Sequence, residues 1–231
     1  MESSITIQYF SDTHLEMMTT FGVDIPVIGD VLVLAGDIGC IREPLTCAFL
    51  AKMCTQFKDV VYITGNHEYY QTGHTAFSWT VKQIDVATEE FCSKIPNLHF
   101  LNKTSWVHPN GQITFHGCCL WSNVPPESEN AVELNMNDYN FIYVPDPSRP
   151  KSYSMRQMTV KDSNALFADQ FNWLNLSIAN SKTPKNVVVT HHLPTYELNP
   201  DKYKGNELNS AFCTDLSKFI EERPQINAWV C

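Results

Sequence analysis

The chain has 231 residues, of which 43% are hydrophobic, and a net charge of −9 from 16 basic and 25 acidic residues. This length supports one large domain with a sizeable core, so we treat residues 1–231 as a single domain. The sequence contains no basic run typical of nucleic-acid binding and no apolar stretch of about 20 residues that could cross a membrane.

The cysteines and the first residues predict the cellular environment. None of the eight cysteines forms a C-x-x-C pair, and the segment that starts Met1-Glu2-Ser3 has no basic region followed by an apolar one. These features predict reduced thiols and a cytoplasmic location, without a signal peptide.

The first half of the chain predicts an α/β protein with a mainly parallel sheet. Continuous apolar runs are typical of strands covered on both faces, and helical spacing separates these runs. Strands are predicted at Ile5–Phe10, Val31–Ala35 and Val60–Ile63, and helices at about Glu43–Phe57 and Thr75–Ser93.

The second half begins with short strands and then becomes polar. The stretch from Ser122 to about Tyr153 contains five prolines and is predicted to be a loop, either a lid over a site or a surface excursion. The elements predicted around it are strands at 98–101, 105–108, 113–120, 186–190 and 227–231, and helices at about 159–179 and 211–222.

Four predicted strands end in polar clusters. The clusters are Asp12-Thr13-His14, Gly36-Asp37, Gly65-Asn66-His67-Glu68 and His191-His192. Taken singly, each cluster also fits an ordinary helix cap, a turn or a buried histidine. Because the carboxyl ends of parallel strands meet at one edge of a sheet, the recurrence of polar clusters there predicts a common site.

The side chains of these clusters suit divalent cations. Carboxylate, imidazole and amide oxygen ligands favour Mn, Fe or Zn, and the absence of cysteine among them argues against a structural zinc site. Asp12 and His14 are two residues apart and can face one ion. Asp37, on the neighbouring strand, can bridge two ions with one oxygen on each.

The order of the clusters resembles the calcineurin-like metallophosphoesterases. The motifs that carry the resemblance are Asp12-x-His14, Gly36-Asp37, Gly65-Asn66-His67-Glu68 and Thr190-His191-His192. The resemblance spans nearly the whole chain, including the segment 136–139. It implies a four-layer α-β-β-α sandwich with a two-metal site at the strand ends.

The resemblance also implies a role for each ligand. Asp12 and His14 would bind the first ion, Asn66 and His191 the second, and Asp37 would bridge the two ions.

The remaining histidines divide into two groups. The resemblance implies that His67 is the acid that assists the leaving group. His192 would lie beside the substrate, or replace His191 as a ligand. Four others have no comparable context and are expected to be structural or surface residues: His74, His99, His108 and His116.

Two departures from the family pattern bear on function. The serine/threonine protein phosphatases read Gly-Asp-x-x-Asp-Arg-Gly at the second motif, whereas this chain reads Gly-Asp-Ile-Gly-Cys-Ile-Arg from Gly36 to Arg42, which argues against that branch. The family's final Gly-His-x-His motif would begin where the chain ends, at Cys231. We therefore expect an incomplete C-terminus that lacks the closing strands of the second sheet.

The sequence thus predicts a dinuclear metal-dependent phosphoesterase. It would hydrolyse phosphomonoesters or phosphodiesters, of a small molecule or a nucleotide, by attack of a metal-bridging hydroxide. The alternative is a catalytically silent relative that acts through binding, because the last ligand motif is absent. A two-metal nuclease fits less well, since the chain is acidic. The sequence predicts neither the substrate nor the oligomeric state.

Overall fold

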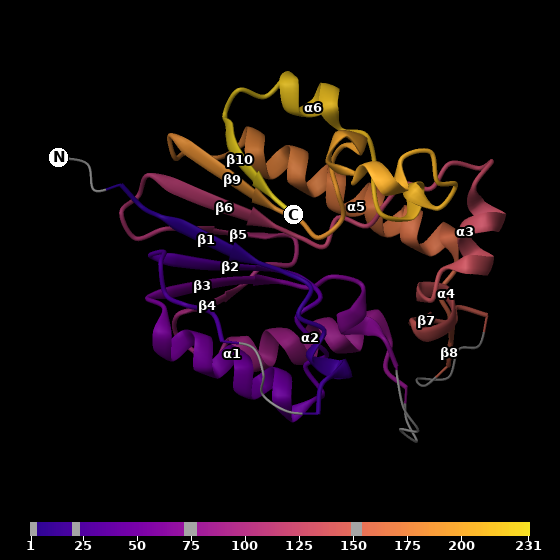
Figure 1. The fold of residues 1–231 in the computed structure, drawn as a ribbon, viewed down its shortest axis with the longest axis horizontal. Helices are drawn as coiled ribbons and strands as arrows, with labels where there is room; N and C mark the ends of the chain where they lie inside the picture. The colour runs from indigo at the N-terminus through magenta and orange to yellow at the C-terminus, as the bar shows by residue number, and fades with distance from the viewer. Residues whose placement is uncertain (1–3, 20–23, 72–77, 149–153) are drawn as a thin grey trace.

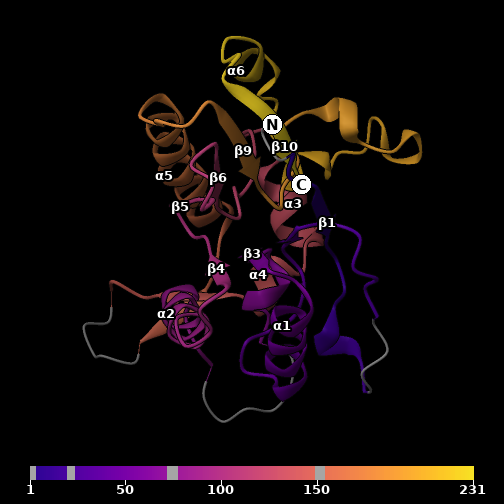
Figure 2. The ribbon, with the colours of Figure 1, turned by 90° about the vertical axis from the view of Figure 1, so that its left-hand side faces the viewer.

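The computed structural model describes residues 4–19, 24–71, 78–148 and 154–231. Two β-sheets lie face to face, and helices cover the outer face of each sheet (Figure 1). In the view turned by 90° (Figure 2), α5 and α6 lie on the side of β6 and β9, and α1 and α2 lie on the side of β3 and β4. The four-layer α-β-β-α arrangement implied by the resemblance is therefore present.

The first sheet contains parallel strands in the order β1-β2-β3-β4. Because all four run the same way, their carboxyl ends lie at one edge of the sheet. Helices α1 (Pro44–Gln56) and α2 (Val81–Cys92) cover its outer face (Figure 1). The strands are β1 (Ile7–Phe10), β2 (Val31–Ala35), β3 (Asp59–Ile63) and β4 (Leu98–Phe100).

The second sheet has the order β10-β9-β6-β5, with β10, β9 and β6 parallel and β5 antiparallel to β6. Helix α5 (Val160–Ala179) and the short α6 (Ser217–Glu221) lie on its outer face (Figure 1). The strands are β5 (Thr104–Val107), β6 (Ile113–Gly117), β9 (Lys185–Val189) and β10 (Ile226–Val230).

Strand β2 explains why an uninterrupted apolar run forms a strand here. Val31, Val33 and Ala35 belong to the apolar cluster that includes residues of the second sheet. Leu32 and Leu34 point the other way and belong to the cluster that includes the outer helices. Both faces of the strand are thus buried, and each fully buried Val or Leu contributes about 1.5–3 kcal/mol to the stability of the fold.

The stretch after Ser122 is more regular than the sequence predicts. It contains helices α3 (Glu129–Asn135) and α4 (Asp138–Phe141), and its strand β7 (Tyr143–Pro145) pairs with β8 (Met155–Gln157). The prediction of a loop was wrong for these residues, because such short elements depend on tertiary contacts rather than on local sequence pattern. Residues 149–153 of the stretch lie outside the described part of the chain.

Two predicted helix boundaries also differ. Helix α2 begins only at Val81, because Thr80 caps it and the Gln83 side chain accepts a hydrogen bond from the Thr80 backbone N–H at 2.8 Å. The predicted start at Thr75 lies outside the described residues. The helix predicted for 211–222 is only α6, preceded by a separate 3-10 turn at Asn209–Ala211.

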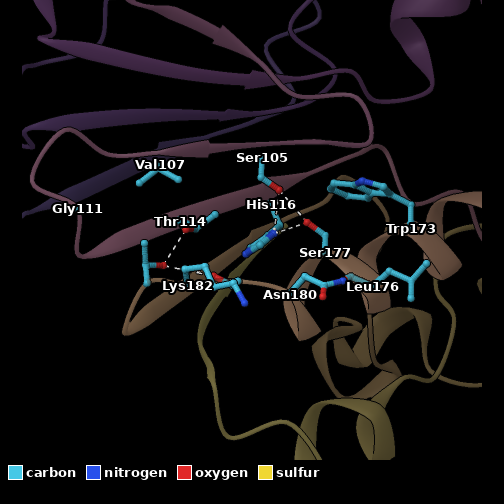
Figure 3. Close-up of a pocket in the computed structure, with 12 residues that line it drawn as sticks. Ser105, Val107, Gly111, Thr114, His116, Trp173, Leu176, Ser177, Asn180 and Lys182 are labelled. Atoms are coloured by element: carbon cyan, nitrogen blue, oxygen red, sulfur yellow. Dashed lines mark hydrogen bonds between the residues drawn. The ribbon is translucent and has the colours of Figure 1, made fainter.

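A groove of about 640 Å³ lies between α5 and the β5–β6 hairpin (Figure 3). His116 sits at its base, where its Nδ1 lies 2.9 and 2.8 Å from the hydroxyls of Ser105 and Ser177. Its Nε2 donates to Asn186 Oδ1 at 3.0 Å. Burial lowers the pKa of His116. This histidine therefore acts as a neutral polar contact between sheet and helix, consistent with the structural role expected for it.

Two further histidines predicted to be structural lie away from the strand-end clusters. His99 contacts Asp59 at 3.0 Å and stacks on Trp106, and His108 is buried. His74 lies outside the described residues. None of the described helices combines the length and the apolar character needed to cross a membrane.

Candidate metal centre

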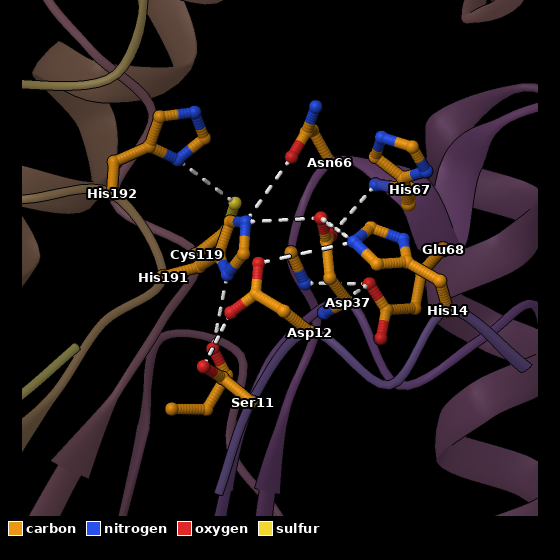
Figure 4. A network of polar contacts seen from close by, with 12 residues as sticks. Ser11, Asp12, His14, Asp37, Asn66, His67, Glu68, Cys119, His191 and His192 are labelled. Carbon is orange, nitrogen blue, oxygen red and sulfur yellow. Dashed lines mark hydrogen bonds and ion pairs between the residues drawn. The ribbon is translucent and has the colours of Figure 1, made fainter. Parts of the chain in front are cut away.

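Strands β1, β2, β3 and β9 deliver their carboxyl ends to one cavity of about 620 Å³. Figure 4 shows the polar side chains of this cavity pointing toward one another. All the predicted site residues line it: Asp12, His14, Asp37, Asn66, His67, His191 and His192.

The backbone at the ends of β1 and β2 is left-handed. Asp12, His14 and Asp37 have φ of 57°, 47° and 53°, a conformation that costs about 1–3 kcal/mol for each residue other than glycine. Two backbone hydrogen bonds hold it, from Asp12 N to Gly36 O at 3.2 Å and from His14 N to Asp37 O at 3.0 Å. The two strand-end loops are thus tied together, and their side chains are fixed toward the cavity.

Two glycines let the loops approach this closely. A Cβ on Gly65 would lie 2.2 Å from Asp37 Oδ1, and one on Gly36 would lie 2.7 Å from His191 Nδ1. Neither position has room for a side chain. The glycines of the second and third clusters therefore make space for the neighbouring candidate ligands.

Two histidines present the same ring nitrogen to Asp37. His14 donates from Nδ1 to Glu16 Oε1 at 3.2 Å, and His191 donates from Nδ1 to the Ala35 carbonyl at 3.0 Å. Their Nε2 atoms face Asp37 Oδ2 at 3.8 and 3.4 Å. Metal-binding histidines usually donate their other ring N–H to a carboxylate or a carbonyl. Both rings are therefore oriented as cation ligands would be.

The two oxygens of Asp37 have different surroundings. Oδ1 accepts the His67 backbone N–H at 2.9 Å, while Oδ2 faces the Nε2 atoms of both His14 and His191. Oδ2 thus lies near both histidines, and the expectation of one oxygen for each ion stays a prediction.

Asp37 and His191 stabilise each other's charge. Burial opposes the charge of both groups, but each is the main charged neighbour of the other. The pKa of Asp37 consequently lies well below its usual range, and the pKa of His191 is raised to about 10. A bound divalent cation would take the place of the His191 proton as the positive partner of Asp37.

Asn66 is held with its oxygen toward the cavity. Its Nδ2 donates to Asp138 Oδ1 at 2.8 Å, and Tyr70 donates its hydroxyl to the same oxygen at 2.6 Å. Its Oδ1 accepts from His191 Nε2 at 3.1 Å. Asp138 is thus the residue that orients the amide. In the sequence it is marked only by the resemblance of the segment 136–139.

His67 lies beside His14, with their ring centroids 4.4 Å apart. Its ring stacks on Tyr70 with centroids 4.0 Å apart, and its Nδ1 donates to Glu16 Oε1 at 3.0 Å. Burial lowers the pKa of His67, but the hydrogen bond to Glu16 and the charge of Asp37 outweigh this effect and raise it. His67 therefore keeps its proton to a higher pH than an ordinary histidine.

His192 also lines the cavity, but its protonation state differs from that of His191. Its Nδ1 lies 3.6 Å from the Cys119 sulfur, and its ring packs against Trp121. Burial and the positive charge of His191 lower the pKa of His192 to about 3, so it is neutral. His191, not His192, contacts Asp37, and this geometry favours His191 as the ligand.

Glu68 supports the site, although the sequence pattern predicts no role for it. Its buried carboxylate accepts hydrogen bonds from the backbone N–H groups of Asp37, Ile38 and Gly65 at 3.0, 2.8 and 2.7 Å. It also accepts one from the Tyr62 hydroxyl at 3.2 Å. It therefore joins the loops after β2 and β3 under the candidate ligands. Burial, together with the nearby charge of Asp37, raises the pKa of Glu68 to about 7.

The donor atoms fall into two groups that share Asp37. One group is His14, Asp37 and His67, the other is Asp12, Asp37 and His191, and within each group the atoms lie within 4.8 Å of one another. Carboxylate and imidazole donors at such distances suit divalent transition ions. The residues present thus fit two neighbouring cations with Asp37 between them. These groups differ from the division that the resemblance implies, which places Asp12 with His14, although His14 Nε2 also lies 3.9 Å from Asp12 Oδ1.

The chain matches a known protein family. Residues 9–231 match the family model of calcineurin-like phosphoesterases. The chain belongs to this family. Membership supports a phosphoesterase-type function and implies divalent metal ions, for which the described residues provide the two donor groups.

Two known proteins are similar to this chain. The chain is 28% identical over 206 residues to an uncharacterized protein, L509, of Acanthamoeba polyphaga mimivirus, covering 86% of this chain and 69% of that protein. The crystal structure of phosphopantetheinyl hydrolase from Mycobacterium tuberculosis superposes with a TM-score of 0.65 at 16% identity, covering 96% of this chain and 79% of that one. At this identity the second likeness establishes the fold.

Proposed function

We propose that this chain hydrolyses a phosphate ester, of a small molecule or a nucleotide, with the help of two divalent cations. The observation that carries the proposal is the position of Asp37 Oδ2, which the Nε2 atoms of His14 and His191 approach at 3.8 and 3.4 Å. A buried carboxylate between two imidazoles, each fixed through its Nδ1, is a suitable place for two neighbouring cations.

The proposed ligands divide between two ions. Asp12 and His14 would hold one ion, Asn66 and His191 the other, and Asp37 would serve both. Mn, Fe and Zn suit this mixture of donors. When bound, the ions supply positive charge for the phosphoryl oxygens and lower the pKa of the attacking water.

His67 is the proposed acid for the leaving group. Glu16 accepts a hydrogen bond from its Nδ1, which leaves Nε2 as the atom able to give a proton to the departing oxygen. Its raised pKa favours the protonated ring that an acid needs. His192 is neutral and lines the same cavity, so we assign it a contact with the substrate.

Hydrolysis of nitrophenyl esters tests the proposal. We expect the purified chain to cleave p-nitrophenyl phosphate or bis-p-nitrophenyl phosphate when supplied with Mn²⁺, and to lose this activity after chelation. The number of metal ions bound per chain should be measured on the same sample. Cations that bind without any ester being cleaved would contradict the proposal and support the catalytically silent alternative.

A further inference from the structure

The segment that follows His192 forms the remaining wall of the cavity. Leu193 N donates to Phe212 O at 2.9 Å, and Thr214 N donates to Leu193 O at 3.1 Å, so both ends of the segment are joined. Within it, Asn209 Nδ2 donates to the Tyr203 carbonyl at 2.7 Å. We call residues 193–212 the rim segment. It begins directly beside the candidate ligands and therefore faces whatever is attached to a bound phosphate.

The rim segment buries a polar side chain without a protein partner. Asn199 is only 9% exposed and lines the cavity. Within the described part of the chain, no protein group is hydrogen bonded to its carboxamide. The carboxamide is accessible to solvent, so a ligand with a matching donor or acceptor would replace its hydrogen bonds to water.

Two aromatic side chains of the rim segment line the cavity, beside the polar Asn206 and Asn209. Tyr203 and Phe212 line the cavity and remain 48% and 46% exposed. Lys202 Nζ lies over the Tyr203 ring at 4.6 Å, so Phe212 offers the more open ring to a ligand. Exposed aromatic faces bind flat rings by stacking.

The cavity also lacks the cations that a polyphosphate needs. Among the described residues that line it there is no lysine or arginine. The phosphates of a triphosphate are ordinarily held by such side chains in addition to metal ions. The site therefore suits one phosphate carried by an uncharged group.

We propose that the rim segment is a subsite for the alcohol part of the substrate, which is an uncharged, planar, hydrogen-bonding group of the nucleoside type attached to a single phosphate. Asn199 would bind the polar edge of that group, and Tyr203 and Phe212 its flat face. This assignment rests on the proposed function, because it takes the strand-end site as the place of the phosphate.

Binding of adenosine to the metal-free protein tests the subsite. Ligand-observed NMR titration should show that adenosine binds and that glycerol, an uncharged alcohol without a ring, binds more weakly. Asn199→Leu and Phe212→Ala should each weaken adenosine binding roughly fivefold or more, the effect of losing one good contact. Leu198→Ala is the matched control, since Leu198 is an apolar side chain of the same segment, 53% exposed, that does not line the cavity.

The outcomes separate the subsite from the hydrolysis. Adenosine binding that is absent, or that Asn199→Leu and Phe212→Ala leave unchanged, would overturn the subsite even if nitrophenyl esters are cleaved. Adenosine binding that depends on both residues supports it, and a simultaneous failure to cleave any ester would count against the proposed function alone. With Mn²⁺ present, a preference for ATP over adenosine 5′-phosphate would overturn the single-phosphate assignment.

Discussion

Both candidate donor groups depend on the single side chain of Asp37. We predict that Asp37→Asn abolishes binding of two cations, because a neutral amide oxygen is a poor partner for two divalent ions. The variant should still fold, since an Asn oxygen can accept the His67 backbone N–H that Asp37 accepts. Metal analysis of the purified variant, compared with the parent, measures the effect.

Asp59 provides the matched control for Asp37. It is also a buried aspartate beside a histidine, with His99 Nε2 at 3.0 Å, but it lies at the start of β3. Asp59→Asn should bind as many cations as the parent. Unchanged metal content in Asp37→Asn would remove Asp37 from the proposed ligand set.

His67 should matter for chemistry more than for cation binding. We predict that His67→Asn lowers kcat by about 100-fold or more, the usual scale for general acid–base help, while the metal content stays nearly unchanged. The loss should shrink for nitrophenyl esters, whose leaving groups depart without a proton. Equal losses for alkyl and nitrophenyl esters, measured by steady-state kinetics, would rule out the acid role.

At the scale of elements, the sequence was most informative about buried strands. The continuous apolar runs at Val31–Ala35 and Val60–Ile63 predict strands, because a strand that is covered on both faces is apolar at nearly every position. It is less informative about α3, α4 and the β7–β8 pair. The position of α4, for example, follows from Asp138 contacting Asn66 and Tyr70, which are about 70 residues away in sequence.

The same limit applies to the support of the site. The strand-end rule brings the candidate ligands together, but it does not reveal Glu16 beneath His14 and His67, or Glu68 beneath the loops. These carboxylates accept hydrogen bonds from residues that only the tertiary fold brings near them, so the local sequence does not indicate their role. Glu68 is the last residue of the polar motif Gly65-Asn66-His67-Glu68, and this position is the signal in the sequence that could have indicated it.

The start of α5 offers a prediction about one element. Asp162 accepts hydrogen bonds from the Thr159 backbone and hydroxyl at 2.8 and 2.7 Å, and from Arg156 at 2.6 and 2.8 Å. Burial raises the pKa of Asp162, but the hydrogen bonds from Arg156 and Thr159 outweigh this and lower it. We predict that Asp162→Asn lowers the free energy of unfolding at neutral pH by about 1 kcal/mol, a value that allows for screening of the partly exposed Arg156.

The pH dependence of this effect has a definite sign. Because the pKa is lower in the folded state, the carboxylate stabilises the protein above its unfolded-state pKa, and this contribution is lost as pH falls through the folded-state value. Urea unfolding should therefore show parent and variant converging in acid. Asp169→Asn, on the same helix and paired with Lys103 at the surface, should change little. A loss that is equal at neutral and acid pH would contradict the capping role.

At the scale of the whole molecule, the candidate ligands come from both sheets. Asp12, Asp37 and Asn66 follow strands of the first sheet, whereas His191 follows β9 of the second. Bound cations would therefore join two layers that otherwise meet mainly through apolar side chains. Binding at such a place should stabilise the complete fold rather than one loop.

We accordingly predict that Mn²⁺ raises the melting temperature of the whole chain. A ligand that binds only the folded state adds about 2.7 kcal/mol at a concentration 100 times its Kd, which corresponds to roughly 5–10 °C for a domain of this size. Thermal unfolding followed by circular dichroism, with and without Mn²⁺, measures the shift, and a chelator should reverse it. The shift should persist in Asp59→Asn and disappear in Asp37→Asn. An equal rise in both variants would mean that Mn²⁺ stabilises the protein elsewhere and not by joining the two sheets.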